Sequence, residues 1–279
     1  MSAPLFDAHN HLHDARLLPW RSEFLAELPA LGLRRSVVNG TCEADWPEVA
    51  ALAVQAPWVL PSFGLHPWHV NERTPAWRET LLHFLNTHPG AGLGEIGLDR
   101  WIEGHDPHAQ AACFRAQIAI AAERNLPATI HCIRAWGALW DVIRECAVPA
   151  RGFLLHAYGG PAEMIAGFLA RGAYFSFSPS FLHERKSVQR EIFRTLPADR
   201  ILVETDAPDL APPPDQNPRP LAGADGRALN HPANIVLAYD ALAKIRGVIR
   251  EELAASVEKN FAGLFLAEKE CPPPPFGAC

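Results

Sequence analysis

The sequence predicts an α/β protein with the architecture of a (β/α)8 TIM-type barrel, folded as a single domain. Short apolar runs rich in β-branched and aromatic residues alternate with stretches of helical periodicity about eight times. The apolar runs are nearly continuous, which is typical of parallel strands that are buried on both faces. A chain of 279 residues also suits such a barrel. A doubly wound open sheet is the alternative architecture.

The expected strands and helices alternate along most of the chain. Strands are expected at residues 4–11, 34–41, 58–67, 91–99, 127–132, 152–160, 173–180 and 200–208. Helices are expected at residues 47–55, 76–88, 108–125, 136–147, 161–172 and 187–196. Pro75 and Pro161 stand where a first helical turn tolerates proline, and Gly172 is a stop signal for the helix before it.

Two segments interrupt this alternation. Residues 207–232 follow the eighth expected strand and are rich in proline, glycine and aspartate, and loops of this length are usually functional or disordered. We expect this segment to lie over the mouth of the barrel, because it starts at the carboxyl end of a strand. Residues 269–279 contain four consecutive prolines and are expected to form a disordered tail, which leaves residues 1–268 as the barrel domain.

Charge and composition narrow the class of protein. The net charge of −6 argues against tight, non-specific binding to duplex nucleic acid, but it is compatible with a nuclease that binds one strand end in a small pocket. The sequence has neither an apolar run long enough to span a membrane nor a signal-peptide pattern. Its six cysteines form no CxxC pair, which argues against a disulfide framework. We therefore expect a cytoplasmic protein that does not associate with a membrane and does not depend on a protein partner.

Six possible metal ligands stand at the ends of five expected strands. They are His9, His11, Glu95, His131, His156 and Asp206. In a (β/α)8 barrel the carboxyl ends of the strands form one rim, where reactive groups gather. Each residue alone has a structural explanation, since a buried histidine can bond to a carbonyl and a carboxylate can cap a helix. Their joint position at one rim favours a metal centre.

The motifs around these residues resemble those of the TatD family of metal-dependent hydrolases. The resemblance covers nearly the whole chain. It is carried, in order, by the motifs FDAHNHL, FGLHP, GEIGLD, IHC, HAYGG, ETDAP, NHPANI and VEKNFAGLF. It implies a barrel enzyme that hydrolyses phosphodiester bonds at nucleic acid ends, with 3′→5′ exonuclease-type activity on a single-stranded DNA or RNA end or on a small phosphoester.

The resemblance also implies a site with two divalent metal ions. One ion would be held by His9, His11 and Asp206, and the other by His131 and His156. Glu95 would bridge them, since metal pairs in hydrolases lie close enough for one carboxylate to span. Imidazole ligands suit zinc, manganese, cobalt or nickel, whereas carboxylate oxygens suit magnesium.

Catalysis and substrate binding are assigned to a few residues near these ligands. Asp206 is the expected proton acceptor, and Glu95 is the second catalytic residue. His66, Arg134 and Tyr158 are the expected substrate contacts. Arg134 stands three residues after His131, where the family usually has an arginine two residues after this histidine, and Tyr158 lies in AYG where most members have Cys-Phe-Ser. These departures concern substrate contacts and leave the metal ligands unchanged.

Two other functions are compatible with the sequence. An esterase, lactonase or amide hydrolase of the wider barrel superfamily is the main alternative. Many such enzymes bridge their metals with a carbamylated lysine, but no lysine occurs between His11 and Lys186, which favours the TatD interpretation. A barrel retained only as a binding protein is the third possibility, and the intact ligand set argues against it.

Overall fold

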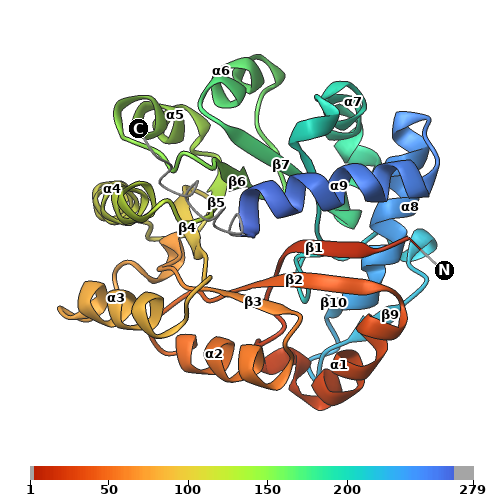
Figure 1. Ribbon diagram of the computed structural model, residues 1–279, viewed down its shortest axis with the longest axis horizontal. Helices are drawn as coiled ribbons and strands as arrows, with labels where there is room; N and C mark the ends of the chain where they lie inside the picture. Colours follow the sequence, from red (N-terminus) through yellow and green to blue (C-terminus); the bar gives the residue numbers. More distant parts are fainter. Residues whose placement is uncertain (1–2, 267–279) are drawn as a thin grey trace, which may run out of the picture.

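The computed structural model describes residues 3–266, in which eight parallel strands form the centre of the molecule (Figure 1). The strands are β1 (Leu5–Asn10), β2 (Leu33–Asn39), β3 (Val59–Ser62), β4 (Leu93–Asp99), β5 (Ala128–Ile133), β6 (Phe153–Leu155), β7 (Ala173–Phe177) and β8 (Ile201–Val203). They pair in sequence order as two runs, β1 to β3 and β4 to β8. Every residue of β1, β4, β6, β7 and β8 is buried.

Backbone hydrogen bonds at two seams close these runs into a barrel. Between β3 and β4, the amide of Phe63 donates to the carbonyl of Gly92 at 3.1 Å, and the amide of Gly94 donates to Phe63 at 3.1 Å. Between β8 and β1, the amide of Asp206 donates to the carbonyl of His9 at 2.9 Å, and His11 donates to Ala207 at 2.7 Å. The predicted (β/α)8 barrel is therefore confirmed, and the second seam contains three of the expected metal ligands, His9, His11 and Asp206.

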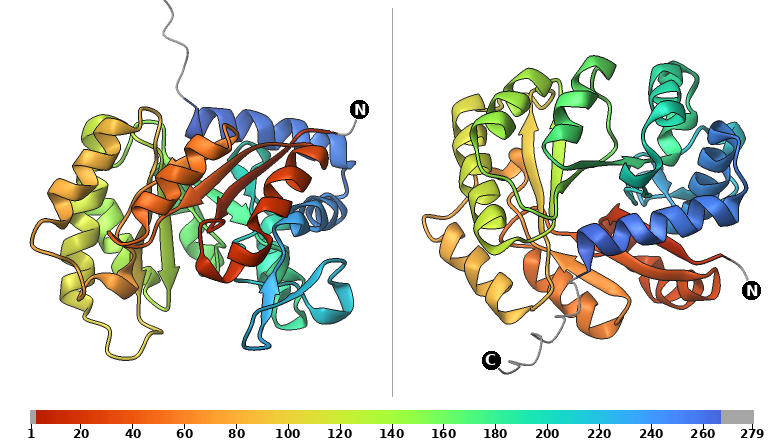
Figure 2. Two further views of the ribbon diagram at one scale, coloured as in Figure 1. Left: turned by 90° about the horizontal axis from the view of Figure 1, so that it is seen from below. Right: turned by 45° about the horizontal axis from the view of Figure 1, so that its top comes forward.

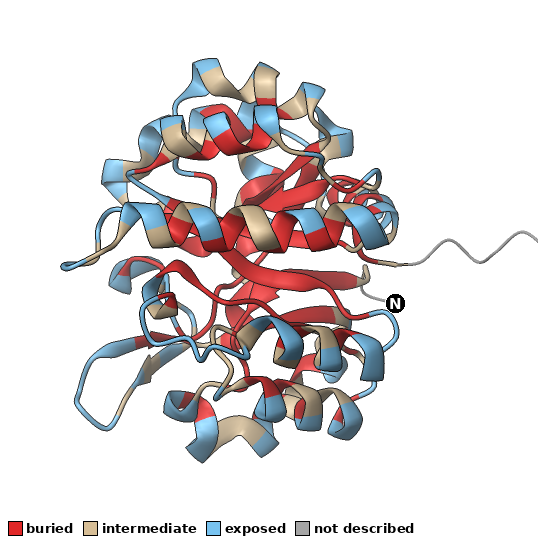
Figure 3. Ribbon diagram, turned by 90° about the vertical axis from the view of Figure 1, so that its left-hand side faces the viewer, coloured by how far each residue is buried: buried red, intermediate tan, exposed pale blue. Residues whose placement is uncertain are grey.

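Helices surround the strands and bury one face each against them (Figures 2 and 3). They are α1 (Arg21–Ala30), α2 (Trp46–Gln55), α3 (Trp77–Thr87), α4 (Pro107–Arg124), α5 (Trp136–Glu145), α6 (Ile165–Ala170), α7 (Ser187–Thr195), α8 (Ile235–Arg246) and α9 (Arg250–Phe265). Within residues 3–266, no helix combines the length and the apolar character needed to cross a membrane.

Several strands are shorter than the sequence predicts. Strand pairing in β3, β6 and β8 stops well before the apolar runs at 58–67, 152–160 and 200–208 end. Most residues beyond each strand are buried, but they turn into the rim of the barrel, where their polar groups bond to side chains and loops. Apolar composition reports burial and does not distinguish a strand from a buried loop.

The last helix, α9, closes the amino-terminal end of the barrel. The rings of Phe6 in β1 and Phe261 in α9 lie 4.9 Å apart. The amide of Asn260 donates to the carbonyls of Ala198 at 2.8 Å and Ile201 at 2.7 Å, at the start of β8. Since this end is covered, access to the barrel interior comes from the carboxyl ends of the strands.

Residues 207–232 are folded and tied to the body of the protein. They contain a 3-10 helix (Pro214–Gln216) and a hairpin of β9 (Pro220–Ala222) and β10 (Ala228–Asn230), which lies beside α1 in Figure 1. The guanidinium of Arg219 lies 2.6 Å from the carboxylate of Glu27 in α1. Asn230 donates to the carbonyl of Thr205 at 2.7 Å. The expected tail, 269–279, lies outside the described residues.

Candidate metal centre

The structure brings all six expected metal ligands together at the carboxyl end of the barrel. His9, Glu95 and His131 project from β1, β4 and β5, and each of the others follows a strand directly or within three residues. All are at most 8% exposed. The six are His9, His11, Glu95, His131, His156 and Asp206.

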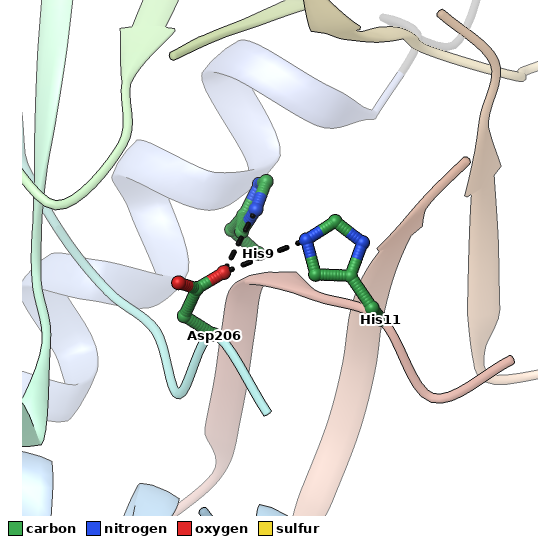
Figure 4. A group of neighbouring side chains, drawn as sticks. All are labelled: His9, His11 and Asp206. Carbon is green, nitrogen blue, oxygen red and sulfur yellow. Dashed lines mark ion pairs between the residues drawn. The ribbon is translucent and has the colours of Figure 1, made fainter. Parts of the chain in front are cut away.

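One half of the cluster consists of His9, His11 and Asp206 (Figure 4). The Oδ1 atom of Asp206 lies 3.1 Å from Nε2 of His9 and 3.6 Å from Nε2 of His11. One donor atom from each of the three side chains falls within 4.8 Å of the others. Asp206 has a φ of 59°, a left-handed conformation that is rare for a residue with a side chain and often found at functional sites.

Glu95 lies between the two halves of the cluster. Its Oε2 atom is 3.4 Å from Nε2 of His9 and 3.3 Å from Nε2 of His11. Its Oε1 atom is 2.8 Å from Nδ1 of His131 and 2.9 Å from Nε2 of His156. The two carboxylate oxygens therefore face different pairs of histidines.

The second half of the cluster brings two imidazole nitrogens face to face. Nδ1 of His131 lies 3.2 Å from Nε2 of His156, and both point at Oε1 of Glu95. Two ring nitrogens this close need a shared hydrogen or a shared cation between them, because two lone pairs repel.

Three histidines of the cluster are also held at the other ring nitrogen by a hydrogen bond, and the fourth, His156, faces a carboxylate there. Nδ1 of His11 lies 2.7 Å from the backbone oxygen of Asn39, and Nδ1 of His9 lies 3.0 Å from its side-chain amide. Nε2 of His131 lies 2.8 Å from Asp99, and Nδ1 of His156 lies 3.6 Å from Glu204. Such partners fix the ring and direct the free nitrogen inward, as around metal-bound histidines.

The charges of the cluster favour a bound cation. Burial alone would raise the pKa of Glu95, but the facing rings of His66, His156 and His9 outweigh it and hold this pKa well below its usual range. Burial would also raise the pKa of Asp206, but the facing rings of His11 and His9 outweigh it and lower this pKa. The same carboxylates raise the pKa of His11 against the effect of burial. The buried carboxylates thus attract positive charge into the site.

A divalent metal ion fits this donor set. Nε2 of His9 is buried and has no hydrogen-bond partner among residues 3–266. Three groups of donor atoms are each compact enough for one ion, namely His9, His11 and Asp206; His9, Glu95 and His156; and His66, Glu95 and His131. Imidazole and carboxylate donors in such mixtures bind first-row divalent ions and magnesium.

His66 completes the wall of the cluster. Its Nε2 atom lies 3.4 Å from Oε1 of Glu95, and its Nδ1 accepts the backbone amide of Trp68 at 3.2 Å. Burial lowers the pKa of His66 to about 4, although Glu95 opposes this shift. The ring is therefore neutral near pH 7 and carries its hydrogen on Nε2, directed into the site.

The other two expected substrate contacts lie in different surroundings. Arg134 is exposed, one residue beyond β5, and its contact with substrate stays a prediction. Tyr158 is fully buried, and its hydroxyl donates to the carbonyl of Pro161 at 2.8 Å. Aromatic neighbours including Trp136 and Phe175 enclose its ring. Tyr158 thus belongs to the protein core, and we leave it out of the substrate site.

The fold and this cluster define a class of proteins, the metal-dependent hydrolases with a (β/α)8 barrel. The profile of the family described as "TatD related DNase" matches residues 6–266. The chain belongs to this family.

Similar sequences and structures agree with this assignment. A protein of Erwinia tasmaniensis and one of Salmonella typhimurium, both named 3'-5' ssDNA/RNA exonuclease TatD, are 29% and 28% identical to the chain. Each alignment covers 94% of this chain. It covers 99% of the Erwinia protein and 98% of the Salmonella protein. The crystal structure of a TatD homologue from Escherichia coli superposes with a TM-score of 0.85 at 22% identity, covering 95% of this chain and 98% of that one.

Proposed function

We propose that this protein is a metal-dependent phosphodiesterase that shortens single-stranded DNA or RNA from the 3′ end. One observation carries the proposal: Glu95 presents one carboxylate oxygen to His9 and His11 and the other to His131 and His156. This arrangement supports two divalent ions side by side, as in hydrolases that cleave phosphate esters. The names of the relatives supply the substrate class.

The proposed ligands divide between two ions. One ion is held by His9, His11 and Asp206, the other by His131 and His156, with Glu95 shared between them. Zinc, manganese, cobalt, nickel and magnesium all suit these donors. When bound, such ions lower the pKa of a water molecule and stabilise negative charge on the phosphate oxygens.

The protein's own groups would then move the proton and orient the phosphate. Asp206 is the proposed proton acceptor, because its ionised carboxylate faces the middle of the cluster. His66 is the proposed phosphate contact, because its neutral ring directs an Nε2 hydrogen toward the same space. Arg134, exposed at the rim, is proposed to pair with a further phosphate of the strand.

Chelation and a 5′-labelled single-stranded oligonucleotide test this function. We expect the protein loaded with manganese, magnesium or zinc to release products that shorten from the 3′ end on a denaturing gel. EDTA should abolish the activity and added metal should restore it. Glu95→Gln should lower the rate at least about 100-fold, since it weakens both halves of the site. Glu103→Ala, a change at an exposed residue after the same strand, should leave the rate unchanged.

A panel of lactones and acyl-amino acids tests the alternative function. Metal-dependent hydrolysis of one of these compounds, with the oligonucleotide left intact, would show an amidohydrolase-type enzyme instead. A cytoplasmic location is part of the proposal, since the six cysteines form no closely spaced pairs. Fractionation of cells that produce the tagged protein tests it.

A further inference from the structure

Two tryptophan side chains lie exposed beside the metal centre. The chain has eight tryptophans, all within the described residues, and only Trp68 and Trp101 are exposed, by 41% and 57%. Their ring centroids are 6.4 Å apart, with the ring planes inclined by 35°. Exposed indole rings forgo the stabilisation that burial gives. Two neighbouring exposed tryptophan rings at the open end of the barrel therefore indicate a binding surface for a ligand that covers them.

A single carboxylate connects the ring of Trp68 and the backbone of Trp101 to the metal centre. Oδ2 of Asp99 accepts the indole N–H of Trp68 at 2.8 Å and also lies 2.8 Å from Nε2 of His131. Oδ1 of Asp99 accepts the backbone amide of Trp101 at 2.6 Å. The ring of Trp68 also packs edge-on against His66, at 5.1 Å between centroids. The ring of Trp68 is thus fixed next to the half of the cluster formed by His131, and the backbone of Trp101 is held beside it.

The exposed rings suit the flat faces of nucleobases. Every base can stack on an aromatic side chain, and proteins that bind single strands use such stacking regardless of sequence. The protein as a whole carries a net charge of −6 and offers little general attraction for a polyanion. Contacts with the bases would therefore contribute a large share of the affinity for a nucleic acid strand.

We propose that Trp68 and Trp101 form a stacking platform for unpaired bases at the 3′ end of the substrate. This inference rests on the proposed nuclease function and specifies its substrate. A base stacked on the platform has left its own duplex, so the platform selects single strands over paired ends. The residues act by binding and take no part in the cleavage step.

Oligonucleotides with and without terminal bases test the platform. Two 5′-labelled single strands would be compared, one ordinary and one with abasic sugars at its last three positions. Trp101→Ala should raise KM for the ordinary strand about tenfold, the effect of losing one stacked base, with little change in kcat. It should leave KM for the abasic strand unchanged. Trp101→Phe should restore most of the loss, because it keeps a flat ring.

A matched control and a fold check complete the test. Val54→Ala removes an apolar side chain that is 81% exposed on α2 and should change neither KM. Circular dichroism should show that all variants are folded. An equal loss on both strands, or no loss on either, would overturn the platform while the nuclease function stands. Failure of the wild-type protein to cleave either strand would overturn both.

Discussion

Asp206 has two proposed roles, as a ligand of a metal ion and as the acceptor of a proton. Its Oδ1 atom faces Nε2 of both His9 and His11, so the carboxylate is placed to hold an ion. Ionised at neutral pH, it is also the carboxylate best placed to accept a proton from water. This geometry is compatible with both proposed roles, and a substitution that preserves the shape of the side chain separates them.

Asp206→Asn keeps an oxygen of the same size but cannot take up a proton. If Asp206 is the general base, kcat should fall by about 10²–10⁴-fold with both metal ions still bound. The measurement is kcat together with metal content by atomic emission. Asp199→Asn, at a carboxylate that is 76% exposed and precedes β8, is the control and should retain activity. If the Asp206 variant loses metal and excess metal restores the rate, Asp206 is a metal ligand and another group is the general base.

Asn39 positions two histidines of the cluster, through its side chain for His9 and its backbone for His11. Asn39→Ala removes only the first contact, so the ring of His9 loses its support. We expect metal affinity, measured by titration calorimetry, to fall about 10–100-fold. Asn39→Asp replaces the amide donor with a carboxylate oxygen, which can accept a hydrogen on Nδ1 when Nε2 of His9 binds an ion, and should recover most of the affinity. Unchanged affinity in the alanine variant would show that Asn39 has no positioning role.

The metal ligands at strand ends could be predicted because all strands of the barrel run in the same direction, so their carboxyl ends lie at one rim. The same rule would also have found Asn39 and Asp99, which are the last residues of β2 and β4. They were missed because an amide or a lone aspartate is common at strand ends for structural reasons. The burial of Tyr158 could not be predicted, since it depends on aromatic neighbours from α5 and β7.

At the scale of elements, β4 organises the centre. Glu95 and Asp99 lie four residues apart and so share one face of the strand. Between them, Gly97 has a φ of 145°, and a Cβ atom there would collide with the backbone oxygen of His131. Glycine therefore lets β4 lie close against β5, which brings His131 to Glu95. This explains why the motif GEIGLD carries two acidic groups around glycine.

Most elements could be predicted from periodicity, and the exceptions have physical causes. The helix α1 is not predicted from the sequence, because its ten residues offer only two buried apolar positions, Phe24 and Leu28, and Pro29 lies inside it. The helix α1 is held by tertiary contacts, such as that of Arg219 with Glu27, which local sequence does not report.

The contact of α9 with β8 gives a prediction about stability. The side-chain amide of Asn260 donates to the half-buried carbonyl of Ala198 and the buried carbonyl of Ile201. Asn260→Ala leaves both without this donor and should lower the free energy of unfolding by about 1–3 kcal/mol, measured by urea denaturation. Lys259→Ala, at the exposed neighbouring position, should change it by less than about 0.5 kcal/mol. If Asn260→Ala and Lys259→Ala changed the free energy of unfolding equally, the hydrogen bonds of Asn260 would contribute nothing to stability.

For the molecule as a whole, the two ends of the barrel have different tasks. At the amino-terminal end, α9 covers the strands and contributes stability. At the carboxyl end, residues 207–232 start directly after Asp206 and are tied to the loop after β1 and to α1. Arg16 donates to Asp209 at 2.9 and 2.8 Å, and Arg219 pairs with Glu27 at 2.6 Å. This segment is therefore held beside the site, and its position over the mouth stays a prediction.

Replacing residues 212–225 with a short glycine-serine linker tests whether this segment contributes to function. Most of the removed residues are exposed or half-buried, so Tm should fall by no more than about 3 °C. If the segment forms part of the substrate site, kcat/KM for the oligonucleotide should fall about tenfold or more relative to bis-p-nitrophenyl phosphate, a substrate too small to reach it. Asn260→Ala is the matched control, because it should lower Tm at the other end of the barrel without changing this ratio. Equal turnover of both substrates by the shortened and full-length proteins would show that the segment only covers α1.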